Sequence, residues 1–582
     1  MKKQLLYSLL FSCTLAATGT SCTGILDSEN LYGKDLNTYY STPDEIHEAL
    51  NGIYNAIYVS HVNSEEAVVA NLFDDLMLGG GGTDDITARE MDAFQDQRED
   101  TYRDLWISTY NGVYRCNALI ERLAEADFSS FFNTEAEAAN FRAQALGEAY
   151  FMRGFFFFRA ARFFGGLPMI VSTDTPRDLP RASVEETFGQ IAADFKAAIE
   201  TFPDKQAADY QLDDFGHANK WIAEGYMGRA YLYYTGYMTN ILKQGVTDIT
   251  LPGEGGGKVS KTDVIGWIED CRKNSGYKLV NDFRNLWPYA YVNERAAMYD
   301  VNGSEPILPW AAKEGLKWAG QDGIHSQVGT GNPEVMFSEI HAFGSWDGDG
   351  TAYVSCRACL FFGLRDNTLV PFYQGWGWGS VHPDFYNEWD DKDLRKEGSV
   401  LKLGDPENGT GGFEYKTGEQ FTGLLNKKYL SLAHNGSDGV KGLFSYIYNS
   451  LSTDYQNWSA QNFCYLRFAD ILLMHSELTG DNSGMNEVRR RAGLEEVPYS
   501  LEALKKERMY EFAFEAQRWF DLVRWGDVEG TNNYYKRAAK VVNGGIETTY
   551  SVNYRPETKG LVSLPETEIR LSNGVYEQNA GW

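Results

Sequence analysis

Apolar residues recur three and four positions apart near both ends of this chain, a spacing that predicts buried helices. The stretch 141–166 shows the pattern most clearly. Its segment Phe155–Phe158 contains four consecutive aromatic residues, so the helix must be covered on several sides. Gly165, Gly166 and Pro168 then end it, because neither residue type continues a helix well. A long, deeply buried helix is therefore expected here.

Further helices follow at short intervals. Ser183 and Glu186 form a capping-box pattern that predicts the start of a helix over 184–203. Another helix is expected at about 218–237, where small residues would let neighbouring helices approach closely: Gly225, Gly228 and Ala230. The succession of helix, turn and helix suggests tetratricopeptide-like pairs, although the spacing is not regular enough to define repeats.

The stretch 507–526 places charges where a helix would bury apolar residues. Its large apolar residues recur at helical spacing, and so do charged residues of both signs, namely Arg508, Glu511, Glu515 and Arg518. Each needs a partner, because an unpaired buried charge is very costly. We therefore expect a partly buried ion network, which suits the locking of one packing arrangement better than it suits catalysis.

Between residues 240 and 456 the helical pattern fades, and Gly, Asn, Asp, Trp and Tyr dominate. Loops on a rigid scaffold are where binding surfaces usually lie. No Pro/Ser-rich linker or charged run marks a domain boundary. We expect a single body over 22–582, with a helical scaffold at about 35–239 and 457–530 and a loop-rich, ligand-binding insertion at about 240–456.

The N-terminus has the features of a targeting segment. Its basic start is followed by the apolar run Leu5–Leu15, which is too short to span a membrane as a helix. Small residues precede Cys22, so residues 1–21 are expected to be a signal peptide and Cys22 a lipidated N-terminus. Cys13 is a competing cleavage site, and a plain secreted protein is the alternative. No later stretch is apolar over 18 residues.

Acidic residues outnumber basic ones, 81 to 53, and the net charge is −28. Such a polyanion repels nucleic acid and anionic membrane surfaces, so neither is an expected partner, while neutral ligands stay open. Five of the seven cysteines follow Cys22, scattered and odd in number, which does not suit a disulfide scaffold. Cys356 and Cys359 form a C-x-x-C pair that suits a redox site or half of a zinc site; small core or loop residues are the alternative.

Two tryptophans in the middle region, Trp376 and Trp378, alternate with glycines that offer them no neighbours to pack against. In a strand, positions two apart face the same side, so the two indoles would form a flat platform. The apolar C–H face of a pyranose ring stacks well on such a surface. The alternative is that one or both fill the core beneath a loop. Tyr373 and Trp346 are further aromatic candidates.

Four carboxylates flank Gly79–Gly82, namely Asp74, Asp75, Asp84 and Asp85. The glycines predict a mobile or tightly turning loop rather than a regular element. Carboxylates in such a loop can accept hydrogen bonds from sugar hydroxyls or bind Ca²⁺; solvated turn residues are the alternative. The Asp-Gly run at 347–350 lacks the Glu that completes an EF-hand, so we expect no cofactor and leave a structural Ca²⁺ undecided.

No catalytic constellation emerges. A glycosidase needs two carboxylates that face one bond, and with 81 acidic residues adjacent pairs arise by chance. The chain has no G-x-S-x-G or H-E-x-x-H motif, and its eight histidines are dispersed. His475 lies on an apolar helix and is expected to be a satisfied core residue. The chain is therefore expected not to be an enzyme.

Several motifs occur in order along nearly the whole chain after Cys22. They are STPDEIHEALNGIYNAIY, WISTYNGVYRCNALIERL, MRGFFFFRAARFFGGLPMI, YLRFADILLMHSEL, EVRRRAGL and LVSLPETEIRLSNGVYEQNAGW. As a set they resemble the SusD/RagB family of outer-membrane, nutrient-binding lipoproteins. The resemblance implies a mainly α, SusD-like fold with tetratricopeptide-like helix pairs and a loop-rich insertion with short strands. It also implies that a tryptophan just before the segment Pro383–Arg395 lines the ligand site, and Trp376 and Trp378 match that place.

The resemblance further implies a cell-surface protein, lipid-anchored in the outer membrane, that captures an oligo- or polysaccharide without cleaving it. Its partner would be a SusC-like TonB-dependent transporter, which receives the glycan. Alternatives are a surface lipoprotein for a peptide or another nutrient, a non-catalytic scaffold, and a glycoside hydrolase. The fold alone does not specify the cargo.

Overall fold

Helix α6 (Glu135–Phe164) forms where the aromatic run predicts it, and it is 30 residues long. Thr134 begins it with a capping box to Glu137, and Gly165 follows its last residue. All four residues of Phe155–Phe158 are buried, because α5, α7 and α8 pack against α6. The long, deeply buried helix is confirmed.

The structure, a computed structural model, describes residues 39–582 apart from the stretches 60–64, 83–85, 97, 177–178, 211–213, 294–305, 307, 322–330, 345–353, 366–368, 414–419, 436–440, 446–449, 453, 531–532 and 544–545. Within these residues the fold is mainly helical with short strands, which confirms the predicted class. No helix in this part of the chain combines the length and the apolarity that crossing a bilayer demands.

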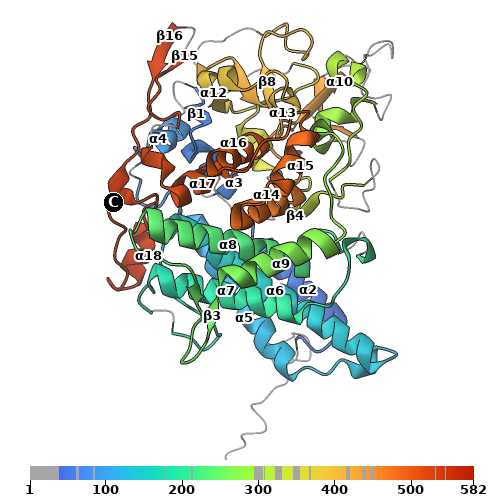
Figure 1. The fold of residues 1–582 in the computed structure, drawn as a ribbon, viewed down its shortest axis with the longest axis vertical. Helices are drawn as coiled ribbons and strands as arrows, with labels where there is room; N and C mark the ends of the chain where they lie inside the picture. Colours follow the sequence, from blue (N-terminus) through green and yellow to red (C-terminus); the bar gives the residue numbers. More distant parts are fainter. Residues whose placement is uncertain are drawn as a thin grey trace, which may run out of the picture.

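Consecutive helices build the lower layer of the molecule in Figure 1, where each packs on the next from α5 to α9. Its members besides α6 are α2 (Pro43–Asn55), α5 (Arg103–Glu125), α7 (Val184–Thr201), α8 (Lys220–Asn240) and α9 (Lys261–Asn274). The capping box of α7 is confirmed, because the Ser183 and Glu186 side chains each accept a hydrogen bond from the other residue's main-chain N, at 3.1 and 2.9 Å. Helix α9 lies in the stretch where the sequence shows little helical pattern.

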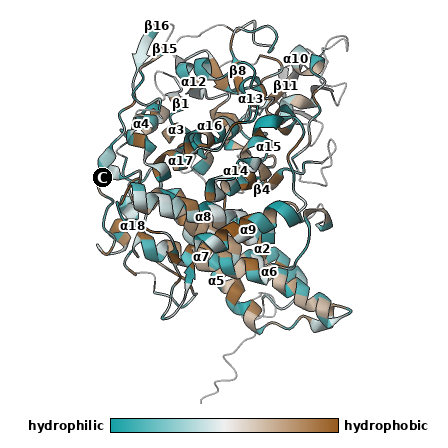
Figure 2. Ribbon diagram, viewed as in Figure 1, coloured by the Kyte–Doolittle hydropathy of each residue, from teal (hydrophilic) through white to brown (hydrophobic). Residues whose placement is uncertain are grey.

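Helix α8 has apolar partners around most of its circumference, and its glycines make this possible. A Cβ on Gly225 would lie 2.9 Å from Ile471, which belongs to the helix Phe468–Thr479, and one on Gly228 would lie 2.6 Å from Ile268 on α9. These distances are too short for a methyl group, so the close approach expected at these two positions is confirmed. Figure 2 shows apolar residues concentrated along the helices of this layer.

The upper part of the molecule in Figure 1 combines short helices with small sheets. The helices are α3 (Glu66–Phe73), α4 (Thr87–Asp92), α10 (Pro309–Lys313), α11 (Arg357–Phe361), α12 (Pro383–Glu388), α13 (Leu394–Ser399), α14 (Phe468–Thr479), α15 (Ser483–Arg491), α16 (Leu501–Glu511) and α17 (Arg518–Trp525). Helix α18 (Glu566–Leu571) lies beside the lower layer in Figure 1. Helices α14 to α17 lie between the small sheets and the lower layer, and α14 packs on α9 while α17 packs on α8.

The sheets have only two or three strands each. The antiparallel pairs are β1 (Met77–Gly80) with β7 (Trp378–Val381), β4 (Val335–Glu339) with β14 (Phe463–Arg467), β8 (Val400–Lys402) with β10 (Leu424–Asn426), and β2 (Ile249–Thr250) with β3 (Lys258–Val259). Strands β5 (Leu364–Arg365) and β6 (Gln374–Gly375) are parallel. The three-stranded sheets are β11 (Leu432–Asn435), β12 (Lys441–Ser445) and β13 (Ser450–Ser452), and β9 (Gln420–Phe421), β15 (Ala539–Asn543) and β16 (Ile546–Tyr550).

The charged stretch 507–526 is not one helix, which corrects the expected continuous stripe. Helix α16 ends at Glu511, and α17 starts at Arg518. Between them Phe514 and Ala516 have positive φ angles of 67° and 57°, a conformation that no helix continues through. The charged side chains therefore cannot pair along one helix surface and instead reach partners on other elements.

A buried ion network is nevertheless present, as predicted. Arg467 contacts three carboxylates, and its Nη1–Glu511 and Nε–Glu515 distances are both 2.8 Å. We use the name buried ion network for Glu334, Asp393, Arg395, Lys428, Arg467, Arg489, Arg491, Glu507, Glu511 and Glu515. The network contains five acidic and five basic residues, and it joins α15 and α16 to the middle of the chain. Arg508 pairs separately with Asp470 and Asp521.

The last residues of the chain return to the lower layer. Val562 N donates to Phe163 O at 2.9 Å, and Asn579 Nδ2 donates to Phe164 O at 3.1 Å. Arg181 Nη1 donates to Glu577 O at 2.8 Å. The first two bonds satisfy main-chain carbonyls at the C-terminal end of α6, which have no partner within the helix, and the third ties Arg181 to the last residues.

Candidate functional site

The glycine-rich and the tryptophan-rich segments lie side by side, because β1 and β7 pair with Gly80 opposite Trp378. Gly81 N donates a hydrogen bond of 2.8 Å to Gly377 O. A Cβ on Gly80, whose φ is +77°, would lie 2.4 Å from the same oxygen. The glycines thus allow two main chains to approach each other. The prediction of a loop at Gly79–Gly82 is wrong for its first half, since Gly79 and Gly80 belong to strand β1.

The two carboxylates before this strand lie inside the protein, which corrects their expected position on a ligand-facing loop. Asp75 is 2% exposed and pairs with Arg518, at 2.7 Å from Oδ1 to Nε and 3.0 Å from Oδ2 to Nη2. Asp74 is 1% exposed and accepts from Leu76 N at 2.8 Å. Burial, and then the charge of Asp75, raises the pKa of Asp74 well above its usual range. Neither side chain is oriented to hold a sugar or Ca²⁺.

The other candidates fall into two groups. Asp84, Asp85 and Trp346 lie outside the described residues, as does Cys22. Trp378 is only 2% exposed, so for this residue the core-filling alternative holds. Trp376 is half-buried. The pair therefore does not form a platform of two exposed indoles, and Trp376 remains as the candidate.

Both tryptophans pack against one ring on α11. The Phe361 centroid lies 4.5 Å from the Trp376 centroid and 4.5 Å from the Trp378 centroid, at interplanar angles of 61° and 69°. These are edge-to-face contacts, which are favourable for aromatic rings. Trp376 N donates to Leu360 O at 2.8 Å, and Arg365 Nη1 donates to Trp376 O at 3.0 Å. The half-buried indole of Trp376 is thus held by its contact with Phe361 and by the hydrogen bonds of its own main chain.

A second set of half-buried aromatics was missed from the sequence. Phe343 and Trp458 stack with centroids 4.3 Å apart and an interplanar angle of 16°. Tyr455 is half-buried, and its ring centroid lies 6.2 Å from that of Tyr373, which is 5% exposed. Two amide residues between two aromatic residues, in Tyr455-Gln456-Asn457-Trp458, are the sequence signal that could have found them.

Main-chain hydrogen bonds hold this second set in place. Gly344 N donates to Asn457 O at 2.7 Å, which joins the loops that carry Phe343 and Trp458. The Asp454 carboxylate accepts from Gln456 N at 3.2 Å and from the Asn457 side chain at 3.1 Å. Burial raises the pKa of Tyr373, so its hydroxyl stays protonated at neutral pH.

Helix α11 connects the two sets. Its first flanking residue, Cys356, donates its main-chain N to Ser459 O at 2.8 Å, next to Trp458. Its last residue, Phe361, supports Trp376. We use the name aromatic site for Phe343, Tyr373, Trp376, Tyr455 and Trp458. The arrangement offers apolar ring faces with amide and hydroxyl groups nearby, which suits stacking and hydrogen bonding rather than bond cleavage.

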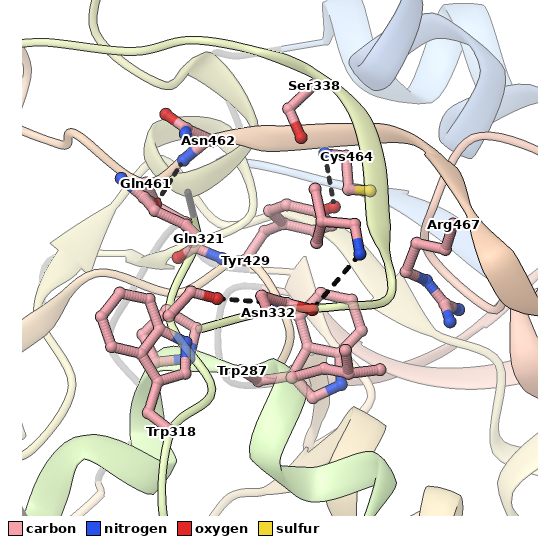
Figure 3. Close-up of a pocket in the computed structure, with 14 residues that line it drawn as sticks. Trp287, Trp318, Gln321, Asn332, Ser338, Tyr429, Gln461, Asn462, Cys464 and Arg467 are labelled. Atoms are coloured by element: carbon pink, nitrogen blue, oxygen red, sulfur yellow. Dashed lines mark hydrogen bonds between the residues drawn. The ribbon is translucent and has the colours of Figure 1, made fainter. Parts of the chain in front are cut away.

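The interior pocket in Figure 3 is a different feature. It is lined by Trp287, Trp318, Tyr429 and Arg467 among others, and its volume is about 30 Å³. That space holds about one water molecule and no sugar ring. Trp287 is buried and packs edge-on against Tyr429, with 5.7 Å between the ring centroids, which gives it a structural role.

Metal chemistry has no support in the described part of the chain, where no group of three or more His, Cys, Asp or Glu side chains is placed to hold a metal ion. His475 is buried and its Nε2 lies 2.8 Å from a Glu269 oxygen, as expected of a satisfied core residue.

The profile of the SusD family matches residues 376–582, and a profile described as "Starch-binding associating with outer membrane" matches residues 26–232. The chain is 22% identical to SusD-like protein P2 of Formosa agariphila over 75% of its own length and 73% of that protein. It is 21% identical to a SusD-like protein of Bacteroides ovatus, over 89% of its length and 82% of that protein.

Solved structures show the same fold. A laminarin-binding SusD-like protein superposes with a TM-score of 0.66 at 20% identity, over 93% of this chain and all (100%) of the other. Surface glycan-binding protein A from Bacteroides thetaiotaomicron, in complex with laminarihexaose, superposes with a TM-score of 0.65 at 17% identity, over the same shares of both chains. The expected SusD-like fold is confirmed.

Proposed function

Since the chain belongs to the SusD/RagB family, whose members are non-catalytic binding proteins, we propose that it captures an oligo- or polysaccharide at the outer membrane. Capture without cleavage means that the protein holds the glycan by contacts alone. One matching profile carries a description that names starch binding and association with the outer membrane, and the two similar structures named above are those of a laminarin binder and a laminarihexaose complex.

The observation that carries the proposal is the pair of supported ring faces at the aromatic site. Trp376 rests on Phe361, and Trp458 stacks on Phe343, so each indole is held before any ligand arrives. A fixed surface loses little conformational entropy on binding. The apolar face of a sugar ring stacks on an indole, while its hydroxyls find amide partners such as the half-buried Gln456. A neutral glycan also avoids repulsion by the net charge of −28.

We further propose that the protein is anchored through lipid on Cys22 and delivers its glycan to a SusC-like TonB-dependent transporter. Support comes from the family and from the signal-like segment before Cys22. Several acyl chains would hold the protein at the membrane stably, as a single chain does not. Capture beside the transporter would raise the glycan concentration at its entrance.

Glycan binding by the chain that starts after Cys22 tests the proposal. Laminarin is the first ligand to try by calorimetry, followed by starch, other plant polysaccharides and microbial polysaccharides. We expect Trp376→Ala and Trp458→Ala each to weaken binding by about 1–2 kcal/mol, roughly tenfold, because each removes a stacking surface. Trp267→Ala is the matched control, since Trp267 is a half-buried tryptophan on α9, outside the aromatic site.

The outcomes separate the alternatives. Binding that survives both aromatic-site variants would move the glycan site elsewhere on the protein. No binding to any polysaccharide would favour a peptide cargo or a scaffold. Release of reducing ends in the same samples would mean that the protein is an enzyme.

A further inference from the structure

Two cysteines lie at the start of the helix that supports the aromatic site. Cys356 is the residue that caps α11, and Cys359 is the third residue of that helix. Each is 1% exposed. Residues three apart in a helical turn lie on the same face, with about 5–6 Å between their Cβ atoms. Both are free thiols in the structure, and the neighbouring Cys359 adds to the burial that raises the pKa of the Cys356 thiol. A small movement of the two side chains would bring the sulfurs within the range of a disulfide.

The surroundings of the two sulfurs differ from those of the other cysteines in the described part of the chain. Burial raises the pKa of the Cys356 thiol while the nearby His341 lowers it, and the Cys359 Sγ lies 3.4 Å from Gln461 Oε1. The remaining three are buried on separate elements, namely Cys116 on α5, Cys271 on α9 and Cys464 on β14. Cys271 and Cys464 each direct Sγ toward a main-chain oxygen at 3.7 Å.

Helix α11 supports both halves of the aromatic site, so a link between Cys356 and Cys359 would act on that site. Phe361, two residues after Cys359, is the ring on which Trp376 rests. The main-chain N of Cys356 is bonded to Ser459 O, beside Trp458. A covalent link between the first turn of α11 and its cap would therefore stiffen the base of both halves of the aromatic site.

We propose that Cys356 and Cys359 are oxidised to a disulfide in the exported protein, and that this bond fixes α11 under the aromatic site. The proposal rests on the export that the proposed function requires, because disulfides persist in the oxidising cell envelope and not in the cytosol. Its test needs no glycan, so it can fail independently of glycan binding.

The chemistry is thiol–disulfide exchange with a disulfide of an oxidoreductase or of glutathione. One cysteine thiolate attacks the oxidant's disulfide, and the second cysteine then displaces the mixed disulfide. The Cys356–Cys359 bond forms, the pair loses two electrons and two protons, and the oxidant leaves as two thiols. Burial raises the pKa of the Cys356 thiol in the folded protein, so the exchange belongs to the stage before α11 is covered. The folded structure would afterwards shield the bond from reductants.

Mass spectrometry gives a direct test. The chain starting after Cys22 is refolded in glutathione buffer, denatured, alkylated and digested with trypsin. Arg357 lies between the two cysteines, so trypsin separates them and the disulfide holds two peptides together until it is reduced. We expect this linked pair, and alkylation of Cys116, Cys271 and Cys464. Alkylation of all five, or a bond between any other two, would overturn the proposal.

A thermal unfolding measurement tests the second half of the proposal. We expect the oxidised protein to unfold at a higher temperature than the same protein treated with a phosphine reductant. The Cys356→Ser/Cys359→Ser variant should show no effect of the reductant, while the control Cys116→Ser should respond as the wild type does. A disulfide whose reduction leaves the unfolding temperature unchanged would refute the claim that it fixes α11.

Discussion

Replacing Arg491 by leucine tests whether the buried ion network holds the C-terminal helices in place. Arg491 is buried at the end of α15, where its Nη1 lies 2.8 Å from Glu334 and its Nη2 contacts Glu511. Arg490, the preceding residue, offers a matched control. Its side chain is 61% exposed and reaches Glu496 at 3.4 Å. The two residues share a helix and a charge and differ in burial.

The expected losses follow from that difference. Arg491→Leu leaves the network with one more negative than positive charge, and removal of one partner from a buried ion pair costs about 3–5 kcal/mol. Arg490→Leu breaks an exposed pair, whose contribution is at most about 1 kcal/mol. Urea unfolding at neutral pH, followed by tryptophan fluorescence, measures both. Equal losses for the two variants would refute the idea that burial sets the value of these charges.

The pH dependence gives a second test of the same reasoning. Burial alone would raise the pKa of Glu511, but Arg491, Arg467 and Arg395 hold it well below its usual range. A carboxyl whose pKa is lower in the folded than in the unfolded state stabilises the fold above its ordinary pKa, and this stabilisation is lost as pH falls. The deficit of Arg491→Leu should therefore shrink below about pH 4, because the wild type loses the same contribution there.

Three further substitutions test a glycine contact, its control and a buried acid. Gly80→Ala should destabilise the protein by about 2–4 kcal/mol, because the new Cβ meets Gly377 O and the positive φ is strained. Its control is Gly52→Ala on α2, where the added methyl group has open space and should stabilise the protein by about 0.5–1 kcal/mol. Equal effects of the two substitutions in thermal unfolding would contradict this expectation. Burial raises the pKa of Glu224 to about 9, so the folded protein keeps a proton that the unfolded chain loses, and stability falls as pH rises toward 9. Glu224→Gln removes this slope, and unchanged slopes in urea unfolding between about pH 5 and 9 would show that Glu224 is ionised in the fold.

The helices near both ends of the chain could be predicted from the sequence because their signals are local. Periodic apolar residues, the capping box at Ser183 and the break at Gly165 all lie within the helices they define or next to them. The presence of buried charges in 507–526 could be predicted for the same reason. Their partners could not, because residues such as Glu334 and Arg467 reach them from distant elements.

The candidate site depends on long-range pairing, and here the sequence was less informative. The residue type at Gly79 and Gly80 disfavours a strand, and only the neighbouring main chain of Gly377, which the sequence does not reveal, explains why a strand forms there. Trp378 is buried because Phe361 comes from another element to cover it. Trp458 was missed, since its stacking partner Phe343 lies more than a hundred residues earlier in the chain.

The return of the last residues to α6 has a consequence for how the protein reaches its native state. The carbonyl of Phe163 receives its donor from Val562, about four hundred residues later in the chain, and the carbonyl of Phe164 accepts from Asn579 as well as from the much nearer Arg181. The end of the central helix therefore lacks part of its hydrogen bonding while most of the chain is being synthesised. Contacts of such long sequence separation slow folding, because a large loop must close first. A chain whose central helix gains some of its hydrogen bonds this late stays incompletely folded for longer, and an unfolded chain is what the proposed export requires.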